Sequence, residues 1–105
     1  IKGTGDLFVP ISMERRYLAL AKAAGTSNLL VQRAIRAPGH CNFSQAERTR
    51  AFDDLVRWLK TGIRPAGDDL SGDLRDIGRQ FTDPIRPGDP GTTSRTRPLV
   101  LAPAA

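Results

Sequence analysis

Two polar residues, Asp6 and His40, stand in the loops where an open α/β sheet places its ligands. Each follows a segment with the composition of a β-strand, and parallel strands bring their carboxyl ends to one edge of a sheet. An aspartate that accepts a hydrogen bond from the Nδ1–H of a histidine fixes the tautomer of the ring and stabilises the imidazolium. Nε2 is then free to take a proton from a hydroxyl. The pair is a candidate acid and base of a catalytic triad, whose third member is a nucleophile.

The elements that would position this pair alternate between strand and helix. Residues 1–5 have the pattern of a strand end that enters a glycine-marked loop. Apolar residues three to four apart predict a helix over 12–24, with Ser12 as its N-cap and Gly25 as its end. The β-branched, apolar run over 29–35 predicts a second strand.

The second predicted helix has the clearest local signals. Ser44 and Glu47 have the spacing of a capping box, in which each side chain bonds the backbone amide of the other residue. Apolar residues follow at helical spacing, and Gly62 is the expected C-terminal end. The order strand, helix, strand, helix predicts an α/β fold with a parallel sheet.

The predicted core is incomplete, because two strands cannot form a parallel sheet that is buried on both faces. Unless the tail covers the exposed apolar face, we expect the chain to associate, for example as a homo-oligomer, or to be partly molten. After Pro65 the chain becomes rich in Gly, Asp, Pro, Arg and Thr. The sequence therefore predicts a folded part over 1–65 and an irregular tail over 66–105.

Two loop motifs resemble those of a known family. Gly3-Thr-Gly-Asp6-Leu-Phe-Val-Pro10 and Gly39-His40-Cys-Asn-Phe-Ser44, separated by a helix and a strand, are similar to the C-terminal end of an α/β-hydrolase. In that family the first loop carries the triad acid and the second carries the triad histidine. The resemblance covers about residues 1–65 and implies that Asp6 is the acid and His40 the base.

The resemblance implies a serine hydrolase that cleaves an ester or amide bond in a small-molecule or peptide acyl substrate. This chemistry uses neither a cofactor nor a metal ion. The family's nucleophile lies in a Gly-x-Ser-x-Gly turn that precedes the acid and the histidine in the chain. That pattern surrounds none of the serines here, which are Ser12, Ser27, Ser44, Ser71 and Ser94. We expect the nucleophile and oxyanion hole to belong to a missing N-terminal part of the hydrolase domain, and this chain alone to be inactive by the triad mechanism.

Composition excludes several other classes of protein. The chain of 105 residues has one cysteine and one histidine, which rules out cysteine-rich and HExxH zinc sites. Its longest apolar runs are far shorter than the ~20 residues that span a bilayer, so no membrane partner is expected. The aromatic residues are scattered, which disfavours nucleic-acid binding.

The charge leaves a second functional class open. Residues 1–60 hold ten Lys and Arg against five Asp and Glu, and residues 61–105 hold six of each. The net charge of +5 therefore lies in the first part, and the alternative is a non-catalytic, hydrolase-like binding module with a basic surface for an anionic partner. Structural roles are also open for single residues. Asp6 suits a turn, His40 suits a solvated loop, and Cys41 suits a small buried position.

Overall fold

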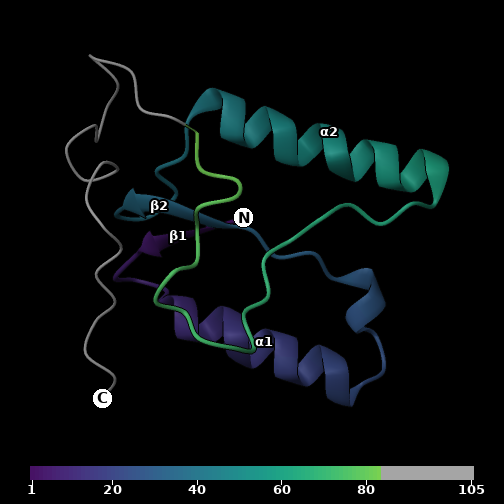
Figure 1. Ribbon diagram of the computed structural model, residues 1–105, viewed down its shortest axis with the longest axis horizontal. Helices are drawn as coiled ribbons and strands as arrows, with labels where there is room; N and C mark the ends of the chain where they lie inside the picture. Colours follow the sequence, from purple (N-terminus) through teal and green to yellow (C-terminus); the bar gives the residue numbers. More distant parts are fainter. Residues whose placement is uncertain (84–105) are drawn as a thin grey trace.

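Two short parallel strands, β1 (Lys2–Gly5) and β2 (Ala34–Pro38), form the centre of the fold. The computed structural model describes residues 1–83. Lys2 lies opposite Ala34 and Gly5 opposite Pro38, with an irregularity in register between Gly3 and Gly5. The helices α1 (Ile11–Ala23) and α2 (Gln45–Thr61) lie on opposite sides of the strands (Figure 1). The predicted α/β class, parallel sheet and incomplete core are confirmed.

The capping box at the start of α2 is formed as predicted. Ser44 Oγ accepts from the Glu47 amide at 3.0 Å, and Glu47 Oε1 accepts from the Ser44 amide at 2.7 Å. At the other end Gly62 has a φ of 72°, the left-handed conformation that favours glycine. Both ends were predictable because each signal acts within a few residues.

The start of α1 differs from the prediction. Pro10, rather than Ser12, is the N-cap residue, and no side chain caps this helix. Proline fixes its own φ, here −61°, and the extended ψ of 152° leads directly into helical backbone at Ile11. Ser12 therefore lies inside the first turn, two residues after the N-cap position.

The second strand also begins later than predicted. Ser27–Leu29 forms a 3₁₀ turn, and β2 starts at Ala34 instead of residue 29. A strand needs a partner, and the partner strand β1 begins with Lys2 opposite Ala34. Before that point the backbone pairs with an irregular segment, because the Gln32 carbonyl accepts from the Asp68 amide at 2.7 Å.

Residues 62–83 contain no helix or strand, yet they pack along the sheet and α1 (Figure 1). Leu70 and Ile77 are buried against Ala34, and Phe81 is buried against Ile35. The outer edge of β2 is also covered here. The Ala34 amide donates to Asp68 Oδ2 at 2.8 Å, and the Arg36 amide donates to Thr82 Oγ1 at 2.9 Å. These side chains satisfy the edge amides that a further strand would otherwise bond.

Large apolar side chains remain exposed on both helices. On α1 they are Met13, Tyr17 and Leu20, and on α2 they are Phe52, Leu55 and Leu59. These residues provide most of the apolar spacing that predicts the two helices. The apolar face of each helix is therefore largely exposed to solvent in this chain. The predicted boundary at residue 65 stays a prediction, and the part of the tail over 84–105 lies outside the described residues.

Candidate active site

Asp6 lies in the tight loop that follows β1, and its carboxylate is the centre of the candidate site. Oδ1 accepts from the backbone amides of Phe8 at 2.9 Å and Val9 at 3.0 Å. Such bonds to amides two and three residues later are typical of an aspartate turn, so the structural role open to Asp6 is real. Both bonds hold Oδ1 in place, and they leave Oδ2 available for other partners.

The second oxygen of Asp6 contacts the imidazole ring of His40. Nδ1 of His40 lies 2.7 Å from Asp6 Oδ2. An ionised carboxylate can only accept hydrogen bonds, so Nδ1 carries the proton and Nε2 of a neutral ring is the free, basic nitrogen. The His40 side chain is 50% exposed, whereas that of Asp6 is 2% exposed. The arrangement presents a base to solvent and keeps its carboxylate partner buried.

Backbone geometry brings the two loops together. Gly39 follows β2 with a φ of 73°, and its amide donates to the Gly5 carbonyl at 3.2 Å. A Cβ on Gly5 would lie 2.8 Å from the Ala37 carbonyl oxygen, so only glycine allows the strands to approach this closely. The Phe8 ring lies edge-on to the His40 ring, with 5.9 Å between centroids. The glycines of both sequence motifs thus determine where the two polar side chains meet.

The pKa of the Asp6 carboxyl is held far below its usual range. The largest cause is the Lys2 ammonium, whose Nζ donates to Asp6 Oδ2 at 2.8 Å. The Val9 and Phe8 amides and the His40 ring lower the pKa further, and burial opposes them. These donors therefore favour the ionised form of Asp6. Lys2 is the member of this site that sequence reasoning missed, and its position four residues before Asp6 is the only sequence signal for it.

Residues beside His40 are engaged differently. Ser44, the serine nearest to it in sequence, accepts from the Glu47 amide and contacts Asp83, so its hydroxyl belongs to the helix cap. Cys41 was expected to be buried, but it is exposed and has a φ of 54°. The loop turns at Gly39 and Cys41 in succession, and this double turn carries the Cys41 side chain outward.

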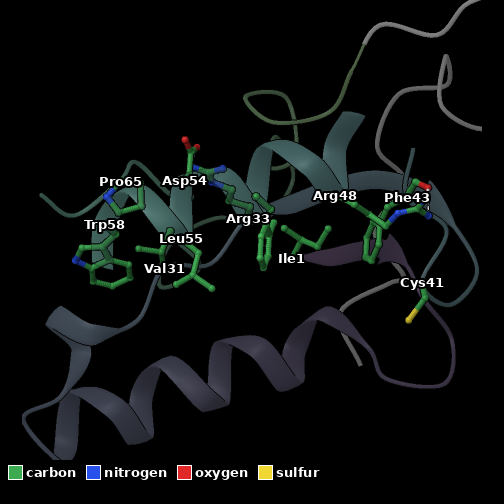
Figure 2. A pocket seen from close by; sticks show the side chains of 12 residues that line it. Ile1, Val31, Arg33, Cys41, Phe43, Arg48, Asp54, Leu55, Trp58 and Pro65 are labelled. Carbon is green, nitrogen blue, oxygen red and sulfur yellow. Dashed lines mark hydrogen bonds and ion pairs between the residues drawn. The ribbon is translucent and has the colours of Figure 1, made fainter. Parts of the chain in front are cut away.

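An apolar hollow of ≈ 670 Å³ opens between α2 and the strands (Figure 2). Cys41 and Phe43, from the His40 loop, lie at one end, and Trp58 and Pro65 lie at the other. Ile1, Val31 and Leu55 are among the side chains between them. Neither Asp6 nor His40 lines it. The hollow is the space left where the sheet and α2 do not meet, so we assign it to the incomplete core rather than to the candidate acid–base pair.

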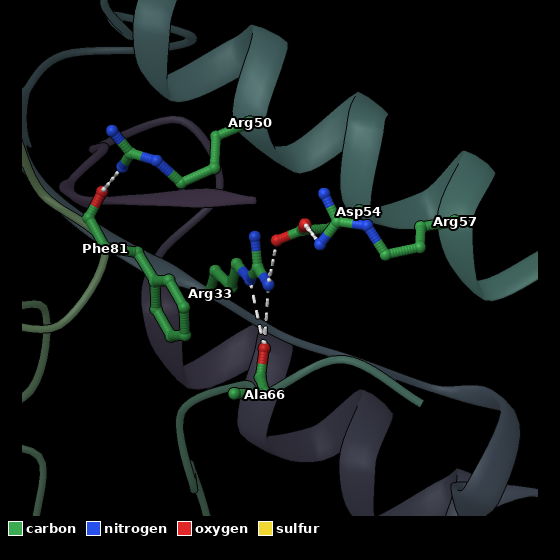
Figure 3. Close-up of polar contacts among 6 residues, drawn as sticks. All are labelled: Arg33, Arg50, Asp54, Arg57, Ala66 and Phe81. Atoms are coloured by element: carbon green, nitrogen blue, oxygen red, sulfur yellow. Dashed lines mark hydrogen bonds and ion pairs between the residues drawn. The ribbon is translucent and has the colours of Figure 1, made fainter. Parts of the chain in front are cut away.

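Arg33 joins three separate segments beside this hollow (Figure 3). Its guanidinium donates to Asp54 Oδ2 at 2.7 Å and to the Ala66 carbonyl at 3.0 Å, and it stacks over the Phe81 ring at 4.2 Å. Asp54 also pairs with Arg57 at 3.1 Å. These cations of the basic half have partners within the chain, which reduces the charge available to an anionic partner. The binding-module alternative stays a prediction.

Within residues 1–83, no group of three or more His, Cys, Asp or Glu side chains could hold a metal ion. No helix in that part of the chain is long and apolar enough to cross a membrane.

Comparison with known proteins finds a partial similarity to a curated amidase. The chain is 32% identical over 69 residues to an o-phthalyl amidase of Xanthobacter agilis, a match that covers 64% of this chain. The chain spans only 15% of the length of that curated relative. No protein-family model matches the chain, and no solved structure does. The similarity is therefore to a small part of a protein that is an amidase by name.

Proposed function

We propose that this chain supplies the acid and the base of a serine hydrolase of the α/β-hydrolase type. The observation that carries the proposal is the 2.7 Å contact between Asp6 Oδ2 and His40 Nδ1, made at the carboxyl ends of two parallel strands. The likeness to an amidase supports the same class of reaction. The substrate would be a small-molecule or peptide acyl compound with an ester or amide bond.

In this mechanism Nε2 of His40 takes the proton of a serine hydroxyl while the serine oxygen attacks the substrate carbonyl carbon. The imidazolium then gives that proton to the leaving alcohol or amine as the carbon–oxygen or carbon–nitrogen bond breaks. Asp6 stays ionised throughout and stabilises the imidazolium. Water repeats the sequence to release the acyl group, again with His40 as the base.

The nucleophile would come from an N-terminal part of the hydrolase domain that this chain lacks. Two observations support this proposal. Ser44 is engaged as a helix cap, and apolar side chains of both helices are exposed as they would be beside a missing part of the sheet. The outer edge of β2 is covered by Asp68 and Thr82, so the sheet would continue on the other side, beyond β1.

The first test reads the protonation of the ring in the 105-residue chain. His40 is the only histidine, so its ¹⁵N ring signals need assignment only to Nδ1 or Nε2 and not to a residue. At a pH where the ring is neutral, the proposal expects Nδ1 to be protonated and Nε2 to be bare, and expects Asp6→Asn to lose that preference. Asp53→Asn, an exposed position on α2, is the matched control and should leave the ring unchanged. A wild-type ring protonated mainly on Nε2 would overturn the proposed pair.

The second test reads the coding DNA upstream in the same frame. An open frame of roughly 200 or more residues with Gly-x-Ser-x-Gly on a strand-to-helix turn is expected. A start codon close to Ile1 with no such serine upstream would contradict the proposal that the nucleophile belongs to the same chain.

A further inference from the structure

Lys2 is a buried charge that the proposed mechanism does not use. Its side chain is 11% exposed and extends from the beginning of β1 to Asp6 Oδ2, the same oxygen that faces His40. The strand holds its backbone, because the Lys2 amide donates to the Arg33 carbonyl at 2.9 Å. A lysine is seldom buried unless its charge is paired, so this placement requires an explanation.

The carboxylate of Asp6 has four donors and no free position. Two are the backbone amides of Phe8 and Val9 on Oδ1, and two are Lys2 Nζ and His40 Nδ1 on Oδ2. The charged or titratable groups that face it are Lys2 from β1 and His40 from the loop after β2. Only Lys2 keeps a positive charge in every protonation state of the ring.

The two states of the ring make different demands on Asp6. When His40 is an imidazolium, the carboxylate has a charged partner in the ring itself. When His40 is neutral and ready to act as a base, Asp6 without Lys2 would be a buried carboxylate with no counter-charge, which is strongly unfavourable.

We propose that Lys2 is a positioning residue, the permanent counter-ion that keeps Asp6 ionised while His40 is neutral. The inference rests on the proposed function, because it assigns Lys2 a role in the half of the cycle in which His40 must be a free base. With Lys2 present, Lys2, Asp6 and His40 together have no net charge when the ring is neutral. Without Lys2 the same group is negative and binds a proton more readily.

The test follows the ¹⁵N signals of His40 against pH in the 105-residue chain. Lys2→Met keeps the apolar stem and removes the charge. We expect the pH midpoint at which the Asp6–His40 pair takes up a proton to rise by about one unit, because the added proton no longer meets the like charge of the ammonium on the same Asp6 oxygen. Lys2→Arg keeps the charge and should restore the wild-type midpoint.

Arg33→Met is the matched control, because it also removes a buried cation from an ion pair, with Asp54, but does not touch Asp6. It should reduce stability and leave the midpoint unchanged. An unchanged midpoint in Lys2→Met, or an equal shift in Arg33→Met, would overturn the inference. If Lys2→Met does not fold, Lys2→Gln, which keeps a donor without a charge, decides by the same criterion.

This outcome is separable from the fate of the proposed function. A wild-type ring protonated on Nε2 removes the Asp6–His40 contact and with it the proposed function. A wild-type ring protonated on Nδ1, together with no response to the loss of the Lys2 charge, removes only the role of Lys2.

Discussion

Nδ1 of His40 and Oδ2 of Asp6 lie 2.7 Å apart, although 34 residues separate them in the chain. The contact is made where β1 and β2 end side by side, with Gly5 opposite Pro38. Its members differ in exposure, since the carboxylate is buried and the ring is half exposed. A buried acceptor that orients an accessible base is the arrangement that general-base chemistry requires.

The first prediction concerns turnover in the complete enzyme that this chain would help to form. His40→Ala and Asp6→Asn should each lower kcat by about 10⁴. The histidine variant loses the base, and the asparagine variant loses the charge that fixes the tautomer. Steady-state hydrolysis of an activated ester measures both, with Asp53→Asn as the control. Near-normal turnover in both variants would show that the pair is structural.

Acid stability provides the second prediction. The folded-state pKa of Asp6 is depressed, so its contribution to stability is fully present above the unfolded value of about 3.9 and is lost as the pH falls toward the folded-state value. Denaturant unfolding between pH 6 and pH 2 should therefore show less decline in Asp6→Asn than in the wild-type chain. Parallel curves for the two proteins would mean that Lys2 and the loop amides do not hold the carboxylate in solution.

The irregular segment 66–83 can be tested through a pair of phenylalanines. Phe81→Ala removes a buried ring that packs with Ile35 and Ala37, and it should cost about 3 kcal/mol. Phe52→Ala, on the exposed face of α2, should change the unfolding free energy by less than about 0.5 kcal/mol in the isolated chain. Equal effects of the two substitutions would contradict the packing of this segment on the sheet.

The fourth prediction compares two serines at the starts of the helices, Ser44 and Ser12. Ser44→Ala should cost about 1 kcal/mol, because Ser44 bonds the Glu47 amide in the capping box of α2. Ser12→Ala should be close to neutral, since no side chain caps α1. Urea unfolding of both variants measures the difference. A larger loss at Ser12 would restore the cap that the sequence predicts there.

Local signals explain which elements were predictable. Ser44, Glu47 and Gly62 determine the ends of α2 through bonds and backbone angles that span a few residues. The second strand is predicted over 29–35 but lies at Ala34–Pro38 in the structure, because its limits depend on where β1 lies beside it. Strand limits are set by pairing between distant segments, and composition does not record that pairing.

The candidate site also has features that the sequence determines and features that depend on the tertiary structure. The residue types of Asp6 and His40, each in a glycine-marked loop after a strand, were determined by the sequence alone, because parallel strands bring such loops to one edge. Only the tertiary structure decided that Lys2 shares the Asp6 carboxylate and that Phe81 is buried on the sheet. It also decided that the apolar stripes of both helices stay exposed. Those outcomes depend on which surfaces meet, and an apolar residue at helical spacing has the same pattern whether or not its partner is present.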